Sequence, residues 1–229
     1  LANGELAHMT GLPKATVTRL TQTLVAGGFL RYDPREQGYR LGYALLSMGH
    51  AVILDSDIVR IARPIMCELG QAHGLNVGLS VGDHIDMVYL AAVQFDQTRL
   101  TRRFAPGTRR PMYGTAIGSA YLSALPLAER AALMDAMRRR CGERWPSVHA
   151  AMRGCAHKMD EQGFCDMAWD DAVSVATPVL VPGHAPCVVN ISFNVVARPE
   201  NRQWRHLADA LLASAARMQQ ACSGLYQGG

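Results

Sequence analysis

The sequence predicts an α+β protein made of two parts of unequal size. Two short helical segments and two short strand segments within residues 1–42 are typical of a winged helix-turn-helix, and residues 43–56 carry apolar side chains at helical spacing, as a linker helix does. Across residues 57–229, hairpins of alternating apolar residues are interspersed with helices, which indicates a domain built on an antiparallel sheet. With 229 residues, 49% of them apolar and 18% charged, the chain can bury a sizeable core.

The N-terminal part has the pattern helix, tight turn, helix. The first helix ends near Gly11, and Pro13 is placed to open the second helix because proline favours the first helical position. In the second helix, Val17, Leu20 and Leu24 recur at spacings of three and four residues. They therefore share one apolar face, which we expect to be turned toward the interior.

The opposite face of the second helix suits a DNA major groove. At 100° per residue, Ala15, Arg19 and Gln22 project away from the apolar face, with threonines on the flanks. Arginine pairs with guanine edges, glutamine with adenine, and threonine with phosphate or a thymine methyl group. The alternative interpretation is a small helical hairpin whose polar face is only solvated.

A two-stranded wing follows the second helix. Residues 29–33 and 39–41 flank a turn at residues 34–38, which contains proline and glycine. The first 41 residues hold five Lys or Arg against three Asp or Glu, half of the chain's net charge of +4, and basic side chains of the wing can bind the DNA backbone. The predicted DNA contacts are Lys14, Ala15, Thr16, Thr18, Arg19, Gln22, Arg31, Arg35 and Arg40.

Two helices are predicted after the wing. The first carries an apolar stripe that needs a partner if the helix stands alone, made of Leu45, Leu46, Met48 and Val52. Residues 55–57 offer an N-cap for the second helix. Because a proline inside a helix removes a hydrogen bond, Pro64 predicts that the second helix is kinked or begins later than Asp57.

The remaining elements are two hairpins, one further strand and four helices. The predicted hairpins pair residues 77–81 with 87–93 and residues 173–181 with 187–195, and the further strand is residues 98–104. The predicted helices are residues 115–124, 126–140, 146–163 and 200–223. Proline at or near the first position supports the second and third of these helices.

Composition and motifs argue against several classes of protein. No stretch approaches the ~18 consecutive apolar residues of a membrane span and the first 30 residues lack a secretory layout, so we expect a cytoplasmic protein with no membrane partner. The six cysteines contain no C-x-x-C pair and are expected to be free thiols. No G-x-S-x-G, H-E-x-x-H or P-loop motif occurs, so we predict no enzyme activity, catalytic residue or cofactor.

A metal site is the weaker of two interpretations of the helix around residue 155. Cys155 and His157, with His149 and Asp160 nearby, are potential ligands, but their spacings are not those of a standard zinc site. We therefore expect a solvated helix face and no bound metal.

Seven short motifs resemble landmarks of one known family in the right order. In the first part they are GLPKATVTRL at 11–20, GFL at 28–30 and YRLG at 39–42. In the second part they are DIVRIARP at 57–64, GTRRP at 107–111, TAIGSA at 115–120 and ATPV at 176–179. Together they cover nearly all of the chain, which thereby resembles the IclR-family transcriptional regulators.

The resemblance implies an organisation and a set of partners. It implies a winged helix-turn-helix, a linker helix and a C-terminal GAF-like effector-binding domain, in a homodimer or homotetramer that binds double-stranded DNA at a palindromic operator. It also implies that most of the first helix of the DNA-binding domain precedes Leu1. The chain departs from the family at Ser119, where lysine is common, and at Asn190 and Asn194, where the last hairpin is usually more apolar.

The resemblance also places the effector in a cavity formed by the helix start near residue 115, the neighbouring strand and the last hairpin. The effector residues that it implies are Leu100, Arg102, Gly114, Thr115, Ala116, Ile117, Asp166, Val175, Asn190 and Ser192. Independently of the resemblance, residues 111–114 lead into a helix whose first N–H groups can bind an anion. The alternative is that Thr115 is only a helix cap and that Asn190 and Ser192 lie on a wet sheet face.

The helix start, Arg102, Asn190 and Ser192 favour a small carboxylate as the effector. If the polar set at residues 190, 192 and 194 faces solvent instead, an aromatic or acyl ligand is favoured. The leading interpretation is a transcriptional regulator modulated by a small organic acid. The alternative is a stand-alone small-molecule-binding or catalytic domain with a vestigial N-terminus.

Overall fold

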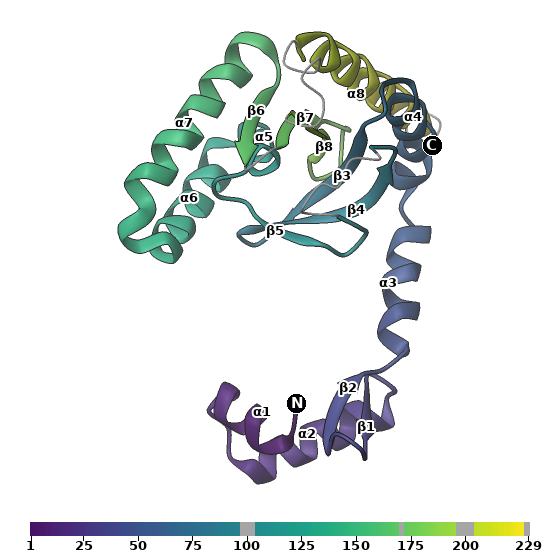
Figure 1. The fold of residues 1–229 in the computed structure, drawn as a ribbon, viewed down its shortest axis with the longest axis vertical. Helices are drawn as coiled ribbons and strands as arrows, with labels where there is room; N and C mark the ends of the chain where they lie inside the picture. Colours follow the sequence, from purple (N-terminus) through teal and green to yellow (C-terminus); the bar gives the residue numbers. More distant parts are fainter. Residues whose placement is uncertain (97–103, 170–171, 196–203, 227–229) are drawn as a thin grey trace. The chain divides into compact units, whose positions relative to one another are not determined.

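The computed structural model describes residues 1–96, 104–169, 172–195 and 204–226 (Figure 1). The chain divides into two compact units, Leu1–Ser56 and Asp57–Gly229. Each unit has its own antiparallel sheet, of two strands in the first and of six strands in the second. The predicted α+β class is therefore confirmed.

The first unit is a winged helix-turn-helix followed by a third helix. Its elements are α1 (Asn3–Thr10), α2 (Lys14–Ala26), β1 (Leu30–Asp33), β2 (Gly38–Leu41) and α3 (Ala44–Leu54). Gly11 ends α1 in the left-handed conformation, with φ of 68°, which glycine adopts without steric cost. The wing pairs Leu30 with Leu41 and Asp33 with Gly38.

The buried face of α2 is narrower than its apolar pattern predicts. Val17 and Thr21 are each 4% exposed, whereas Leu20 is 50% and Leu24 41% exposed. The buried Thr21 hydroxyl donates to the Val17 carbonyl at 2.9 Å and lies 3.2 Å from Asn3 Oδ1 of α1. Helix α1 therefore covers a polar side chain of α2, and this burial is tolerated because the Thr21 hydroxyl is hydrogen-bonded. Of the three residues that share the predicted apolar face, Val17 is therefore buried, and Leu20 and Leu24 lie at its exposed margin.

The second unit is a six-stranded sheet in the order β5-β4-β3-β8-β7-β6, in which every neighbouring pair is antiparallel. The strands are β3 (Asn76–Asp83), β4 (Asp86–Gln94), β5 (Arg109–Pro111), β6 (Cys165–Trp169), β7 (Ala172–Val179) and β8 (Cys187–Asn194). Both predicted hairpin pairs are found, and β3 pairs with β8 across the centre. The short edge strands β5 and β6 were not predicted, and the strand predicted at 98–104 falls, except for Phe104, outside the described residues.

Helices cover both faces of this sheet (Figure 1). The helices of this unit are α4 (Asp57–His73), α5 (Ala116–Ser123), α6 (Leu127–Cys141), the short 3₁₀ helix η1 (Gly142–Arg144), α7 (Trp145–Gln162) and α8 (Arg205–Tyr226). The α4 and α8 helices pack against each other and against the sheet, and α5 lies against β7 and β8 with α7 beside it. The α4 helix begins at Asp57 and tolerates Pro64 because that residue lies on its exposed side.

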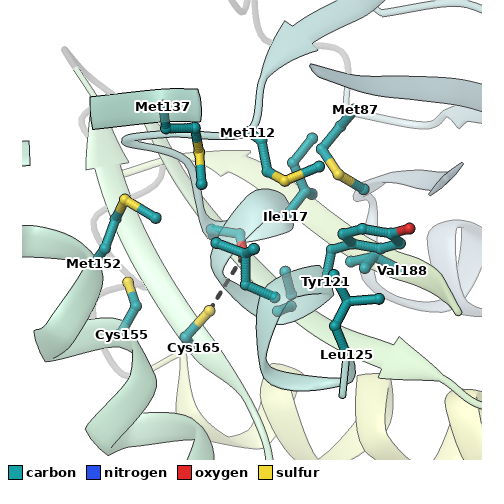
Figure 2. Packing of buried hydrophobic residues seen from close by; sticks show 14 of the residues in the cluster. Met87, Met112, Ile117, Tyr121, Leu125, Met137, Met152, Cys155, Cys165 and Val188 are labelled. Atoms are coloured by element: carbon teal, nitrogen blue, oxygen red, sulfur yellow. Dashed lines mark hydrogen bonds between the residues drawn. The ribbon is translucent and has the colours of Figure 1, made fainter. Parts of the chain in front are cut away.

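The core beneath α5 is rich in sulfur (Figure 2). Met87, Met112, Met137 and Met152 are each at most 4% exposed and surround Ile117. A Cβ on Gly118 would lie 1.8 Å from the Met112 carbonyl oxygen, so only glycine lets α5 approach the preceding loop this closely. Glycine at this position thereby fixes the first turn of α5 against residues 112–114.

Candidate nucleic-acid interface and ligand cavity

The exposed side of α2 presents a basic and polar face. Lys14, Ala15, Thr16, Arg19 and Gln22 are all exposed. Because the buried residues 17 and 21 mark the inner side of the helix, 100° per residue places residue 19 at the centre of the outer side. This arrangement leaves one arginine, one lysine and one glutamine available to a groove of DNA.

Thr18 differs from the other predicted contacts on this helix. Its side chain is half-buried, its hydroxyl donates to the Lys14 carbonyl at 3.0 Å, and it accepts from Asn3 Nδ2 at 3.3 Å. Thr18 therefore lies at the edge between α1 and α2, with its hydroxyl already engaged.

The three arginines of the wing have different surroundings. Arg40 forms ion pairs with Asp33 at 2.8 Å and with Glu36 at 3.1 Å. Arg31 lies over the Tyr43 ring, with its guanidinium carbon 5.5 Å from the ring centroid. Arg35 lies in the turn, and no ion pair involves its side chain within residues 1–56, all of which are described.

Asp33 holds this turn in place. Its carboxylate accepts from the Arg35 backbone N–H at 3.1 Å and from Arg40 Nε at 2.8 Å. These two donors keep the pKa of Asp33 below its ordinary value. The wing therefore presents the Arg35 side chain from a turn whose own charges are paired.

The second unit contains a cavity of about 100 Å³ at the start of α5. It is bounded by the α5 N-terminus, by β4, β5 and β6, and by the centre of the sheet. Its lining residues are Tyr89, Phe104, Arg110, Gly114, Thr115, Ala116, Ile117, Met167, Ala168, Ser174 and Ser192. Among these described residues Arg110 is the one charged side chain, so the cavity combines apolar walls and a few hydroxyl groups with a single cation.

Thr115 caps the α5 helix and also lines the cavity. Its hydroxyl accepts from the Gly118 backbone N–H at 3.2 Å, and Gly114 before it has φ of 67°. The backbone N–H groups of Ala116 and Ile117 have no acceptor within the helix, as at any helix N-terminus, and the helix dipole makes this end positive. Thr115 thus combines the role of a helix cap with a place in the cavity wall.

Two serine hydroxyls from adjacent strands form the polar floor of the cavity. Asn190 Nδ2 donates to Ser174 Oγ and to Ser192 Oγ, each at 3.2 Å. Asn190 and Ser192 are each 1% exposed, so this part of the sheet is not a wet outer surface. Asn190 lies behind the two serines and orients them, and its side chain also interacts with the phenol of Tyr89.

An aromatic pair forms another wall. Tyr89 stacks on Phe104 with ring centroids 4.6 Å apart. Burial raises the pKa of Tyr89, so its phenol stays neutral. A Cβ on Gly78 would lie 2.3 Å from the Tyr89 ring and 2.8 Å from Asn190 Oδ1, so the absence of a side chain at Gly78 makes room for both.

The structure places the predicted effector residues in three groups. Gly114, Thr115, Ala116, Ile117 and Ser192 line the cavity, and Asn190 supports it from behind. Asp166 and Val175 are not in the lining: the Asp166 carboxylate accepts from Lys158 Nζ at 2.6 Å, and Val175 points away from the face that carries Ser174. Leu100 and Arg102 lie outside the described residues.

The cation that lines the cavity is Arg110, which is not among the effector residues predicted from the sequence. Its neighbour Arg109 forms ion pairs with Asp83 at 2.6 Å and with Asp86 at 3.1 Å on one side of β5. Alternation along a strand then directs residue 110 to the other side. The alternation of side chains along the strand could have indicated Arg110 from the sequence, but only if residues 109–111 had been predicted as a strand. Tyr89, Phe104, Met167, Ala168 and Ser174 were also missed.

The described residues contain no group of three or more His, Cys, Asp or Glu side chains arranged to hold a metal ion. His157 is paired with Glu161 at 3.3 Å, and both side chains are largely exposed. Within the same ranges, none of the helices has the length and apolar content that crossing a bilayer requires.

Comparison with known proteins gives two family matches. Residues 50–220 match the model described as "Bacterial transcriptional regulator IclR C-terminal", and residues 1–34 match the "IclR helix-turn-helix domain". The HTH-type transcriptional regulator TsaQ1/TsaQ2 of Comamonas testosteroni is 34% identical over 165 residues, 72% of this chain and 59% of that protein. The chain spans about half the length of most curated relatives that it matches.

Solved structures agree with these matches. An IclR family transcriptional regulator from Brucella abortus is 32% identical, with a TM-score of 0.86 over 96% of this chain and 84% of that one. An IclR homolog from Microbacterium hydrocarbonoxydans, solved in complex with 4-hydroxybenzoate, has 17% identity and a TM-score of 0.72 over 96% of this chain and 90% of that one. The predicted fold class and the predicted family resemblance are both confirmed.

Proposed function

The chain belongs to the IclR family of bacterial transcriptional regulators, and from this premise we propose that it binds operator DNA through α2 and the wing under the control of a small organic acid. The observation that carries the proposal is the exposed face of α2, on which Arg19 lies opposite the buried Val17 and Thr21. Contacts from this face to the base edges would supply the sequence preference. Contacts from Arg35 to the DNA phosphates would supply affinity that does not depend on sequence.

A gel-shift assay tests DNA binding against the alternative of a stand-alone ligand-binding or catalytic domain. The full-length protein is titrated onto DNA upstream of the neighbouring genes and onto random DNA of equal length. A regulator shifts the upstream fragment at a concentration at least ~10³-fold lower than random DNA. Absence of a shift with either fragment, or equal, salt-sensitive shifts of both, would support the alternative.

The effector would bind in the α5 cavity. The N-terminal N–H groups of α5 and the Arg110 guanidinium can stabilise a carboxylate, while Ser174 and Ser192 can hydrogen-bond a polar substituent. The stacked Tyr89 and Phe104 rings provide an apolar wall for the rest of the molecule. The 4-hydroxybenzoate complex of the Microbacterium homolog supports this class of ligand, since that molecule combines a carboxylate with an aromatic ring.

We expect organic acids to stabilise the protein and their amides to leave it unchanged. The reason is that only the charged carboxylate gains from the helix dipole and from Arg110. At a ligand concentration of a hundred Kd, mass action stabilises the folded state by ~2.7 kcal/mol, which raises the Tm by several degrees. A thermal-shift screen that pairs each acid with its amide, including 4-hydroxybenzoate with 4-hydroxybenzamide, measures this. Equal shifts within each pair would exclude an anion site at α5.

We propose that α3 mediates assembly into a dimer. Met48 is 55% exposed and Val52 64%, and with Leu45 they lie on one side of the helix at spacings of three and four. Two copies related by a two-fold axis would then present two α2 helices to the two halves of a palindrome.

The variant Val52→Glu should therefore shift the protein from dimer to monomer at micromolar concentration. It places a charge in the apolar stripe, where burial against a second copy is costly. Ser47→Glu adds the same charge on the opposite side of α3 and is expected to leave the dimer intact. Light scattering on the two variants measures the difference. A monomeric parent protein, or equal behaviour of the two variants, would contradict the assignment.

A further inference from the structure

A second cavity of about 80 Å³ lies between α5, α6 and α7. It is separate from the effector cavity, because the first turn of α5 (Ala116 and Ile117) lines the effector cavity and later residues of the same helix (Ser119, Leu122 and Ser123) line this one. The two cavities therefore share one helix and have no lining residue in common.

Two buried polar groups on its lining residues are poorly satisfied. Ser119 is 5% exposed, and its hydroxyl interacts with the Cys155 thiol but with no other described residue. Arg130 Nε is also buried, and it has no hydrogen-bond partner among the described residues. Buried donors are nearly always paired in folded proteins, so an unpartnered guanidinium N–H beside a weakly engaged hydroxyl, on residues that line one cavity, points to a ligand that accepts hydrogen bonds.

The geometry of Arg130 limits which of its atoms can serve a ligand. Its Nη2 donates to the Ser123 carbonyl at 2.9 Å and to the Leu125 carbonyl at 3.2 Å, where α5 ends. These bonds fix the guanidinium plane and leave Nε without a partner. Arg130 takes part in no ion pair within the described parts of the chain, so its charge has no counter-ion there.

The remaining lining residues define the charge and shape of the ligand. His149 and the exposed Arg153 are the other ionisable side chains in the wall, and none of the described lining residues is acidic. Met134, Met152 and Leu122 provide apolar surface. A site with basic, apolar and hydroxyl-bearing walls, an unpartnered Arg130 Nε–H and a volume of about 80 Å³ suits an anion with a short apolar end.

We propose that this cavity is a second ligand site, which binds a short-chain carboxylate. One carboxylate oxygen would accept from Ser119 Oγ–H and the other from Arg130 Nε–H, with the alkyl end against the methionines. A carboxylate fits better than an amide because the anion also neutralises the unpaired guanidinium.

The probe for this site is acetate, and the test separates it from the effector cavity. The parent chain for the measurement carries Ala116→Leu, which fills the effector cavity and leaves the α6–α7 side of α5 unchanged. Acetate binding is followed by calorimetric titration, with acetamide and inorganic phosphate titrated in parallel. We expect acetate to bind to this chain, and acetamide and phosphate to bind at least tenfold more weakly.

Two further substitutions in that chain locate the binding. Ser119→Ala removes the Ser119 hydroxyl, and Ala156→Phe fills the cavity from an exposed position on α7, so that both variants should fold. Each should weaken acetate binding at least tenfold. The matched control is Ser214→Ala, a buried serine of α8 whose hydroxyl donates to the Ala210 carbonyl at 2.8 Å, and acetate affinity should be unchanged there.

Three results would overturn the proposal: no acetate binding to the Ala116→Leu chain, undiminished binding after both Ser119→Ala and Ala156→Phe, or equal binding of acetate and acetamide. None of them bears on DNA binding or on the effector cavity. Conversely, equal thermal shifts with acids and amides in the unmodified protein would argue against the effector cavity as an anion site and would leave the proposal of this second site standing.

Discussion

Replacing Arg19 with alanine should weaken operator binding by ~1–3 kcal/mol, which is about 5- to 150-fold, and should relax the base preference at one position of each half-site. The physical reason is its place at the centre of the exposed face of α2, where a guanidinium can donate two hydrogen bonds to a guanine edge. Fluorescence anisotropy with operator DNA and with single-base variants of it measures both effects.

Arg35→Ala is the matched control for this experiment. Arg35 belongs to the wing turn and forms no ion pair within residues 1–56, so we expect it to contact phosphate and to contribute equally on every sequence. Its removal should make the salt dependence of binding shallower by about one unit. If Arg19→Ala reduced binding to operator and to random DNA by the same factor, α2 would not be the element that reads the bases.

Ala116→Leu should abolish the response to the organic acid while DNA affinity stays at the level of the unmodified protein. Ala116 is 2% exposed and lines the effector cavity beside the helix N-terminus, so a leucine side chain there occupies the space of the ligand. Overpacking of this kind costs ~1–3 kcal/mol of stability, which a domain with a large core tolerates. The measurement is the thermal shift with acid, together with DNA binding with and without acid.

Ala150→Leu is the control for the added volume. Residue 150 lies on the exposed side of α7 and lines neither cavity, so the acid response should persist in this variant. Circular dichroism verifies that both variants are folded. A normal acid response in Ala116→Leu would move the effector away from the start of α5.

Most elements of the fold could be predicted from local patterns. Both hairpin pairs, the turn before α2 and the helices of the second unit follow from alternation, proline placement and apolar periodicity, which depend on residues close in sequence. The strands β5 and β6 were not predicted because they are short edge strands, of three and five residues, which are held in place by pairing with β4 and β7. That pairing is a tertiary contact and leaves little local signal.

The cavity was predictable only in part, for a related reason. Its helix side follows from Gly114 to Ile117, a continuous motif. Its sheet side depends on which of the two alternating sets of strand residues faces α5. Val175 was predicted to lie near the effector, whereas the adjacent Ser174 lines the cavity. An error of one residue in a strand changes the face, and correcting it requires the order β3-β8-β7 of strands that are far apart in sequence.

The small interior of the first unit has a thermodynamic consequence. In residues 1–56, all of them described, only Val17, Thr21 and Gly38 are buried, and neither α1 nor α3 contains a buried residue. Backbone amides of this unit should therefore exchange with deuterium by local opening, at free energies well below that of global unfolding of the chain. If these segments become ordered when the protein binds DNA, they bury additional surface. The heat-capacity change of complex formation should then be more negative than the protein–DNA contact surface alone would produce.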